Sequence, residues 1–152
     1  MRRVRCARSS LVREGKSTRF FFYGTLMDRE LLSTVLGRRV WPRELIPAVL
    51  RGYRRSPVHA ERYPIVLPRR GASVRGRVLD RVTAAERARL AAYEGDAYEP
   101  ARAWVEIPGQ FRKPVLFFKP KPGAHLVTNR QWSLASWRLR HAASALEVLA
   151  GG

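Results

Sequence analysis

The sequence predicts a single α+β domain in which a small mixed β-sheet or β-barrel is flanked by helices. Three observations predict this class. The chain has 152 residues, which is the length of one domain. After residue 19 it contains six short apolar or alternating segments typical of strands, together with three helical patterns. The two kinds of segment do not alternate strictly and no segment is repeated, which argues against an all-parallel sheet and against a repeat protein.

The domain is expected to begin with a buried strand followed by a helix. Residues 20–23 form an apolar run of three phenylalanines and a tyrosine that ends before a glycine, as short buried strands do. Asp28 is a suitable N-cap for a helix that runs to about Leu36, whose apolar residues share one face. Gly37 stands where a C-terminal cap belongs.

Three further strands are expected in the middle of the chain, over residues 47–53, 63–67 and 73–79. The last of these alternates, and it places Val74, Gly76 and Val78 on one face. A glycine inside a strand indicates either a bulge or the close approach of another part of the protein. Gly76 therefore predicts one of these two features.

The second predicted helix has well-defined ends. Thr83 and Glu86 form a capping box, in which the threonine hydroxyl accepts from the Glu86 N–H and the glutamate reaches back. The helix is expected to run to Glu94 and to stop at Gly95. The remaining elements are strands over residues 101–107 and 114–119 and a last helix over residues 132–149.

Basic residues dominate the charge of the chain. Thirty lysines and arginines against twelve acids give a net charge of +18, the usual electrostatic signature of a nucleic-acid partner. However, 26 of the 30 are arginines scattered in ones and twos, which is also what a GC-rich genome would leave on an ordinary surface. We therefore expect no specific nucleic-acid partner. A basic nucleic-acid-binding module is kept as an alternative, with Trp104 between Arg102 and Glu106 as its one hint.

Cysteine content and hydropathy limit the class of protein further. The single cysteine, Cys6, excludes an intrachain disulfide framework and a zinc site built on paired cysteines. No apolar run approaches the ~20 residues of a membrane helix. We expect a cytoplasmic protein without a membrane partner.

Residues 1–19 differ in kind from the rest of the chain. They hold seven basic residues and one acid without hydrophobic periodicity, so we expect them to be disordered. They lack the apolar region of a secretory signal. A transit peptide, a tail and translation from an upstream start codon all stay open for this segment. The single folded domain is therefore expected over residues 20–152.

The first motif that carries chemistry is the Tyr-Gly-Thr-Leu of residues 23–26, where a predicted strand turns into a helix. Gly24 allows either a close approach of the backbone to a ligand or a positive φ. The N–H groups of the turn and of the first helical turn converge there, and with the helix dipole they favour a carboxylate or phosphate. An ordinary glycine turn is the alternative. The P-loop pattern of phosphate sites is absent.

The second motif is the Tyr-Glu-Gly-Asp-Ala-Tyr of residues 93–98. Glu94 falls in the last turn of its helix, where the helix dipole makes a carboxylate unfavourable by about 0.3–1 kcal/mol. A carboxylate placed there between two tyrosines is a candidate base with a raised pKa. Asp96 and Glu99 would raise that pKa further if they lie close to it. The alternative is a solvated glutamate at a frayed helix end.

Taken together, the two motifs resemble the gamma-glutamylcyclotransferase-like family of small α+β barrel proteins. In that family a strand ends in Tyr-Gly-Ser/Thr-Leu or Asn, and some 60–80 residues later a helix ends in Glu-Gly followed shortly by Tyr. Here these are residues 23–26 and Glu94-Gly95 with Tyr98. Residues 50–53 and 74–78 are similar to the family's intervening Gly-Tyr and Val-x-Gly-x-Val strands. The resemblance covers about residues 20–119.

The resemblance implies an enzyme that releases 5-oxoproline from a gamma-glutamyl amine or amino acid by intramolecular attack of the α-amino group. It implies that Glu94 acts as general base and then as acid. It also implies a substrate-binding role for five residues: Tyr23, Gly24, Thr25, Leu26 and Tyr98. No metal or other cofactor is implied, and the expected partner of a monomeric protein is the small gamma-glutamyl substrate.

Two features depart from the family pattern. The strand at residues 116–119 carries phenylalanine where the family often places tyrosine, and residues 119–130 match no family motif. The identity of the leaving amine stays open. A relative that keeps the pocket for binding a small molecule without catalysis is an alternative to the enzyme.

Overall fold

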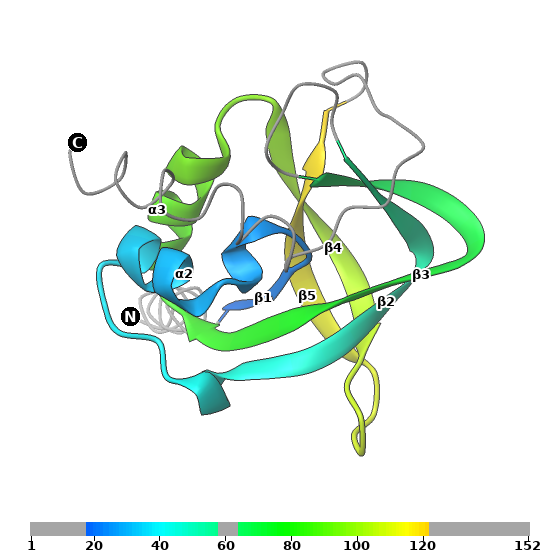
Figure 1. Ribbon diagram of the computed structural model, residues 1–152, viewed down its shortest axis with the longest axis horizontal. Helices are drawn as coiled ribbons and strands as arrows, with labels where there is room; N and C mark the ends of the chain where they lie inside the picture. The colour runs from blue at the N-terminus through cyan, green and yellow to red at the C-terminus, as the bar shows by residue number, and fades with distance from the viewer. Residues whose placement is uncertain (1–17, 58–63, 122–152) are drawn as a thin grey trace, which may run out of the picture.

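The computed structural model describes residues 18–57 and 64–121, and within them five strands close into a barrel (Figure 1). The order of the strands around the barrel is β1-β3-β2-β4-β5. Both α-helices of the described part, α2 and α3, lie on the same side of this barrel (Figure 1). The elements are β1 (Thr18–Phe22), the 3₁₀ turn η1 (Thr25–Met27), α2 (Arg29–Leu36), the 3₁₀ turn η2 (Pro42–Glu44), β2 (Leu45–Pro57), β3 (Pro64–Val82), α3 (Ala84–Glu94), β4 (Tyr98–Glu106) and β5 (Lys113–Pro120).

The barrel is mixed, as the sequence predicts. Four of its five strand pairs are antiparallel, while β1 and β5 close the barrel in parallel through the pair Phe20 and Leu116. The predicted fold class, a small mixed sheet or barrel flanked by helices, is therefore confirmed, and the structure shows that the sheet closes into a barrel. The first strand begins at Thr18, two residues earlier than expected.

Alternation along the strands creates two hydrophobic cores. Phe21, Val78 and Phe117 point into the barrel and form its interior with their neighbours. Phe20 and Phe22 point the other way, toward a second core that α2 and α3 cover with Leu32 and Leu90 among others. The helices therefore lie on the face of β1 that points away from the barrel interior. They are close to the C-terminal end of β1, where the first motif, residues 23–26, begins.

The described residues contain five strands where the sequence indicated more. The sequence predicts two strands over residues 63–67 and 73–79, but residues 64–67 and 73–79 belong to one strand, β3, and residue 63 lies outside the described residues. Pro68 and Gly71 indicate a break, yet β3 pairs with the same partner, β2, on both sides of a bulge (Arg51 opposite Ser73, then Tyr53 opposite Pro68). The helix expected over residues 132–149 lies outside the described residues.

Local capping signals position the two helices as predicted. The Asp28 carboxylate accepts from the Leu31 N–H at 2.9 Å, and Gly37 ends α2 with a left-handed φ of 72°. Thr83 and Glu86 form the predicted capping box of α3, with two hydrogen bonds of 3.1 Å. Gly95 follows the last residue of α3 with a φ of 80°, a conformation that favours glycine.

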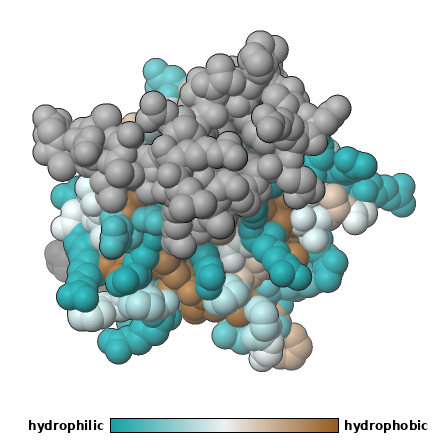
Figure 2. Space-filling view, viewed as in Figure 1, coloured by the Kyte–Doolittle hydropathy of each residue, from teal (hydrophilic) through white to brown (hydrophobic). Residues whose placement is uncertain are grey.

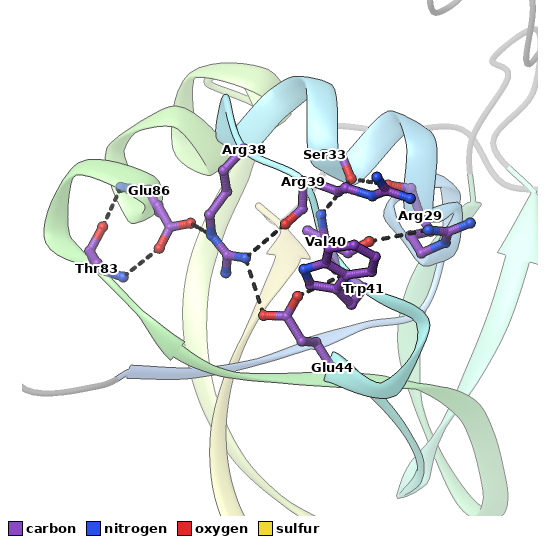
Figure 3. Close-up of polar contacts among 9 residues, drawn as sticks. All are labelled: Arg29, Ser33, Arg38, Arg39, Val40, Trp41, Glu44, Thr83 and Glu86. Atoms are coloured by element: carbon purple, nitrogen blue, oxygen red, sulfur yellow. Dashed lines mark hydrogen bonds and ion pairs between the residues drawn. The ribbon is translucent and has the colours of Figure 1, made fainter.

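A polar network ties the start of α3 to the end of α2 (Figure 3). Arg38 donates to Glu86 at 2.6 Å and to Glu44 at 3.2 Å. Burial alone would raise the pKa of Glu86, but hydrogen bonds from Arg38 and Thr83 hold it below its usual value. One turn further along α3, Arg89 donates to the carbonyl oxygen of Leu36 at 2.5 Å. The orientation of α3 against α2 is therefore fixed by polar contacts as well as by the hydrophobic core.

Gly76 shows why a strand of this barrel needs a glycine. A methyl group at this position would overlap the carbonyl oxygen of Phe22 and the ring of Phe21 on the neighbouring strand. The predicted close approach is thus confirmed, and the partner is β1 itself.

The face of the described part that Figure 2 shows is mainly polar where grey residues do not cover it. Hydrophilic side chains form most of the coloured surface in Figure 2, with hydrophobic atoms visible between them. Trp41, Trp104 and Phe111 are the exposed large hydrophobic residues of the described ranges. None of the helices in these ranges has the length and apolar character needed to cross a membrane.

Candidate active site

A small cavity of about 150 Å³ opens where β1 ends, between the first motif and the end of α3. Its lining includes every residue that the sequence and the resemblance single out for the site: Tyr23, Gly24, Thr25, Leu26, Glu94 and Tyr98. The two motifs are about 70 positions apart in the chain and meet because β1, α2 and α3 all contribute side chains to the second core. The structure thus brings the predicted residues together, while their roles stay predictions.

The first motif forms a 3₁₀ turn between β1 and α2. Met27 donates its N–H to the carbonyl of Gly24, and Asp28 donates to that of Thr25, each at 3.0 Å. The first N–H groups of such a turn have no acceptor inside it and are the ones that can serve a ligand. The Asp28 side chain caps the N-terminus of α2 as predicted, so the Leu31 N–H of this helix is not available to the anion that the sequence predicts there. Any anion in the pocket therefore meets the turn rather than the helix.

Gly24 has a φ of −127°, so a positive φ is not the reason for glycine at this position, and that alternative is wrong. The close approach that it allows is to the protein itself. A Cβ atom at this position would lie 3.1 Å from Cγ and Cδ of Pro64, which also lines the cavity. The missing side chain lets the proline ring pack directly on the turn.

Glu94 is the last residue of α3 and the carboxylate of the pocket. Burial raises its pKa from 4.5 to about 8. The exposed Asp96 and the half-buried Glu99 make no contribution to this shift. The pKa of Glu94 is therefore raised by burial and not by the negative charges of these two residues, as we had considered. The position at a helix end does not leave Glu94 fully exposed to solvent, because the residue lines the cavity and is half-buried.

Tyr23 has its hydroxyl group engaged. It donates to the carbonyl oxygen of Phe118 at 2.6 Å, and the side chain is 7% exposed. Burial raises its pKa well above the ordinary value, and the neighbouring Glu94 and Tyr98 act in the same direction. Tyr23 therefore stays protonated and acts as a wall of the pocket. Tyr98, 6% exposed, lines the pocket beside it.

Sequence reasoning missed Tyr93 as a site residue, although it precedes Glu94. The Tyr93 and Thr25 hydroxyl oxygens lie 3.0 Å apart, and both residues line the cavity. Arg55, which is a neighbour of Tyr23 but does not line the cavity, was missed as well. It lies near enough to Tyr23 to affect its titration, and burial lowers the pKa of its guanidinium. No alternating pattern singles out one arginine among 26, so this position had no signal in the sequence.

The remaining walls of the cavity are apolar. Phe21, Phe22, Leu26, Pro64 and Phe118 supply them, and Phe118 comes from the strand in which the sequence departs from the family pattern. Such walls exclude water from around the Glu94 carboxyl, which is the physical cause of its raised pKa. Within residues 18–57 and 64–121, no group of three or more histidine, cysteine or acidic residues could hold a metal ion.

Comparison with known proteins places this arrangement in a family. The model of the family described as "Gamma-glutamyl cyclotransferase, AIG2-like" matches residues 20–134, a range that contains both motifs. The chain belongs to this family. Protein AIG2 C of Arabidopsis thaliana is 27% identical over 140 residues, which cover 88% of this chain and 79% of that protein.

Solved structures agree with the fold of the AIG2-like family. A solution structure of an Arabidopsis thaliana protein has a TM-score of 0.64 at 24% identity, covering 89% of this chain and 81% of the other. A structure named gamma-glutamyl cyclotransferase has a TM-score of 0.61 at 12% identity, covering 88% of this chain and 86% of the other. At these identities the likeness establishes the shared barrel, and the activity has to be argued from the pocket.

Proposed function

We propose that this protein releases 5-oxoproline from a gamma-glutamyl amine or a gamma-glutamyl amino acid. The observation that carries the proposal is the shared cavity of Glu94 and the turn at residues 24–26, with a carboxyl group whose pKa is about 8. Membership in the cyclotransferase family supports the same reaction class.

The proposed reaction is an acyl transfer within the substrate. The Glu94 carboxylate takes a proton from the substrate's α-ammonium group, which frees the nitrogen lone pair. This nitrogen attacks the γ-carbonyl carbon, so that a carbon–nitrogen bond of the five-membered ring forms. The bond from the same carbon to the leaving amine then breaks, and Glu94 returns its proton to that amine. The ring nitrogen also loses its second proton, which the departing amine takes up as it leaves in its ammonium form. No atom or electron is needed from any other reactant.

The raised pKa suits Glu94 to both halves of this reaction. An ordinary carboxylate is a weak base toward an α-amino group, whose pKa in model compounds is about 8. A carboxyl with a pKa of about 8 exchanges a proton with such an amine at little cost in free energy. The same group, once protonated, is available to the leaving nitrogen.

The 24–26 turn suits the charged end of the substrate. Its leading N–H groups favour an anion, and we assign them the α-carboxylate of the gamma-glutamyl group. The cavity is small and has apolar walls, which favour a folded glutamyl chain whose nitrogen approaches its own carbonyl at ~3–3.5 Å.

The test is mass-spectrometric detection of 5-oxoproline after incubation with gamma-glutamyl amines, gamma-glutamyl amino acids and glutathione. We expect product from at least one substrate and a loss of about 10²–10⁴-fold in Glu94→Gln. Asp96→Asn is the matched control, because it neutralises an exposed acid two residues away. Full activity in Glu94→Gln would remove the assigned base. A folded wild-type protein that binds 5-oxoproline in calorimetry but makes none would instead identify a binding relative.

A further inference from the structure

The geometry points to Tyr93 as a positioning residue: its hydroxyl holds the end of α3 against the turn at residues 24–26 and thereby sets where the Glu94 carboxyl lies. This inference rests on the proposed function, because it explains how the base and the substrate-binding turn keep their relative positions.

The contact joins two elements that are distant in the chain, and it adds a directional hydrogen bond to the apolar packing that Leu26 and Tyr93 share in the second core. Thr25 lies in the 3₁₀ turn after β1, and Tyr93 lies in the last turn of α3. Their hydroxyl oxygens are 3.0 Å apart across 68 positions of sequence. Thr25 is 6% exposed and Tyr93 is half-buried, so bulk water competes poorly for this hydrogen bond.

Glu94 needs such support because of its place in the helix. Helix ends fray, and the dipole at a C-terminus disfavours a carboxylate. The polar anchors of α3 lie nearer its start, at Glu86 and Arg89, as Figure 3 shows for Glu86. The hydrogen bond between the Tyr93 and Thr25 hydroxyls holds the opposite, C-terminal end of α3, one residue before Glu94.

The titratable groups around Glu94 allow the position of its carboxyl to be measured. Those lining the cavity with it are Tyr23, Tyr93 and Tyr98, and the cavity's described lining holds no lysine, arginine or histidine. A carboxyl that moves out of this enclosure gains water and returns toward its ordinary pKa.

The test compares Tyr93→Phe, Thr25→Val and the double variant with wild type. Each change removes one hydroxyl and keeps the shape of the side chain. We expect kcat to fall about 10- to 100-fold, because displacement of a reacting group by about 1 Å has effects of that size. The double variant should lose no more than either single one, since both break the same bond. Thr25→Ser keeps the hydroxyl and should restore most of the activity.

Two controls separate positioning from general damage. Tyr53→Phe removes a hydroxyl from a tyrosine that packs on Phe117, away from the pocket, and should leave kcat unchanged. Carbon-13 NMR of the Glu94 carboxyl in the free protein should give a pKa near 8 in wild type and a clearly lower one in Tyr93→Phe. A change that only destabilised the fold would leave this value in place.

The outcomes distinguish the inference from the proposed function. A wild-type protein inactive on the whole panel would refute the function, while the NMR titration would still decide the role of Tyr93. An active wild type whose Tyr93→Phe variant keeps both its kcat and the Glu94 titration would overturn the inference alone. Additive losses in the double variant would also overturn it.

Discussion

The hydroxyl of Tyr23 donates a 2.6 Å hydrogen bond to the carbonyl oxygen of Phe118, across the seam where the barrel closes. The parallel pairing of β1 and β5 in this seam includes the pair Phe20 and Leu116. Tyr23 follows β1 directly, and its hydrogen bond extends the closure to the start of the candidate active site. The bond therefore fixes the point from which the turn at residues 24–26 departs.

Tyr23→Phe should lower the free energy of unfolding by about 1–2 kcal/mol, because it leaves a buried carbonyl without this donor. We also expect lower 5-oxoproline formation, since the turn loses its tether to β5. Urea unfolding followed by circular dichroism measures the first effect. Tyr53→Phe, in β2, is the comparison for a lost hydroxyl elsewhere in the barrel. Equal stability of the two variants would contradict a stabilising role for the hydrogen bond from Tyr23 to Phe118.

The pH dependence of activity should reflect Glu94. Only the deprotonated carboxyl can accept the substrate's proton, and its pKa is about 8. We expect kcat/KM to rise from pH 6 to a maximum near pH 8 and to fall again by pH 9, because the substrate's α-ammonium group, whose pKa is also about 8, must still carry the proton that Glu94 takes. Initial rates of 5-oxoproline formation across this range test the expectation. A rise with its midpoint near 4.5 would mean that the carboxyl is solvated in the working enzyme.

Glu94→Gln should be more stable than wild type at high pH. The folded-state pKa of about 8 exceeds the unfolded value, so the folded protein binds more protons between about pH 4.5 and pH 8. Its stability therefore falls as pH rises through this window, and glutamine avoids that loss. We compare the free energy of unfolding of the variant with that of wild type at pH 5 and at pH 9. The difference should shift in favour of the variant by ~2 kcal/mol between these pH values, which is within the ceiling of about 1.36 kcal/mol per pKa unit. Urea unfolding at both pH values measures this gain, and a difference independent of pH would exclude a buried carboxyl.

Glu86→Ala should weaken the anchor of α3. The side chain is 6% exposed, accepts from Arg38 at 2.6 Å and completes the capping box with Thr83. We expect a loss of ~2 kcal/mol, below the range for fully buried pairs because Arg38 is partly exposed. Since the folded pKa of Glu86 is lowered, its contribution is complete above about pH 4.5 and is lost as pH falls further. Glu30→Ala, at an exposed site in α2, should change stability much less.

Gly76→Ala should destabilise the barrel by ~3 kcal/mol or more, because the added methyl group meets the Phe22 carbonyl on β1. Ser73→Ala on the exposed face of the same strand is the matched control. Chemical unfolding of both variants gives the comparison. Near-equal stabilities would show that β1 and β3 can separate without cost.

Short-range rules predicted the features that depend on neighbouring residues. The Asp28 cap, the capping box of Thr83 and Glu86 and the stop at Gly95 are confirmed because each concerns hydrogen bonds within one turn of a helix. The same rules failed at residues 68–71. Proline and glycine there indicate a turn, but pairing with β2 across the bulge keeps β3 continuous.

The sequence by itself determined which residues carry the two motifs, where α2 and α3 begin and end, and that a small mixed sheet or barrel joins them. Only the tertiary structure decided that Glu94 faces the turn at residues 24–26, that Tyr93 bonds to Thr25, and that burial raises the Glu94 pKa. The physical reason is the range of the forces involved. Capping and alternation act between near neighbours, whereas enclosure from water arises only when strands and helices distant in the chain pack together.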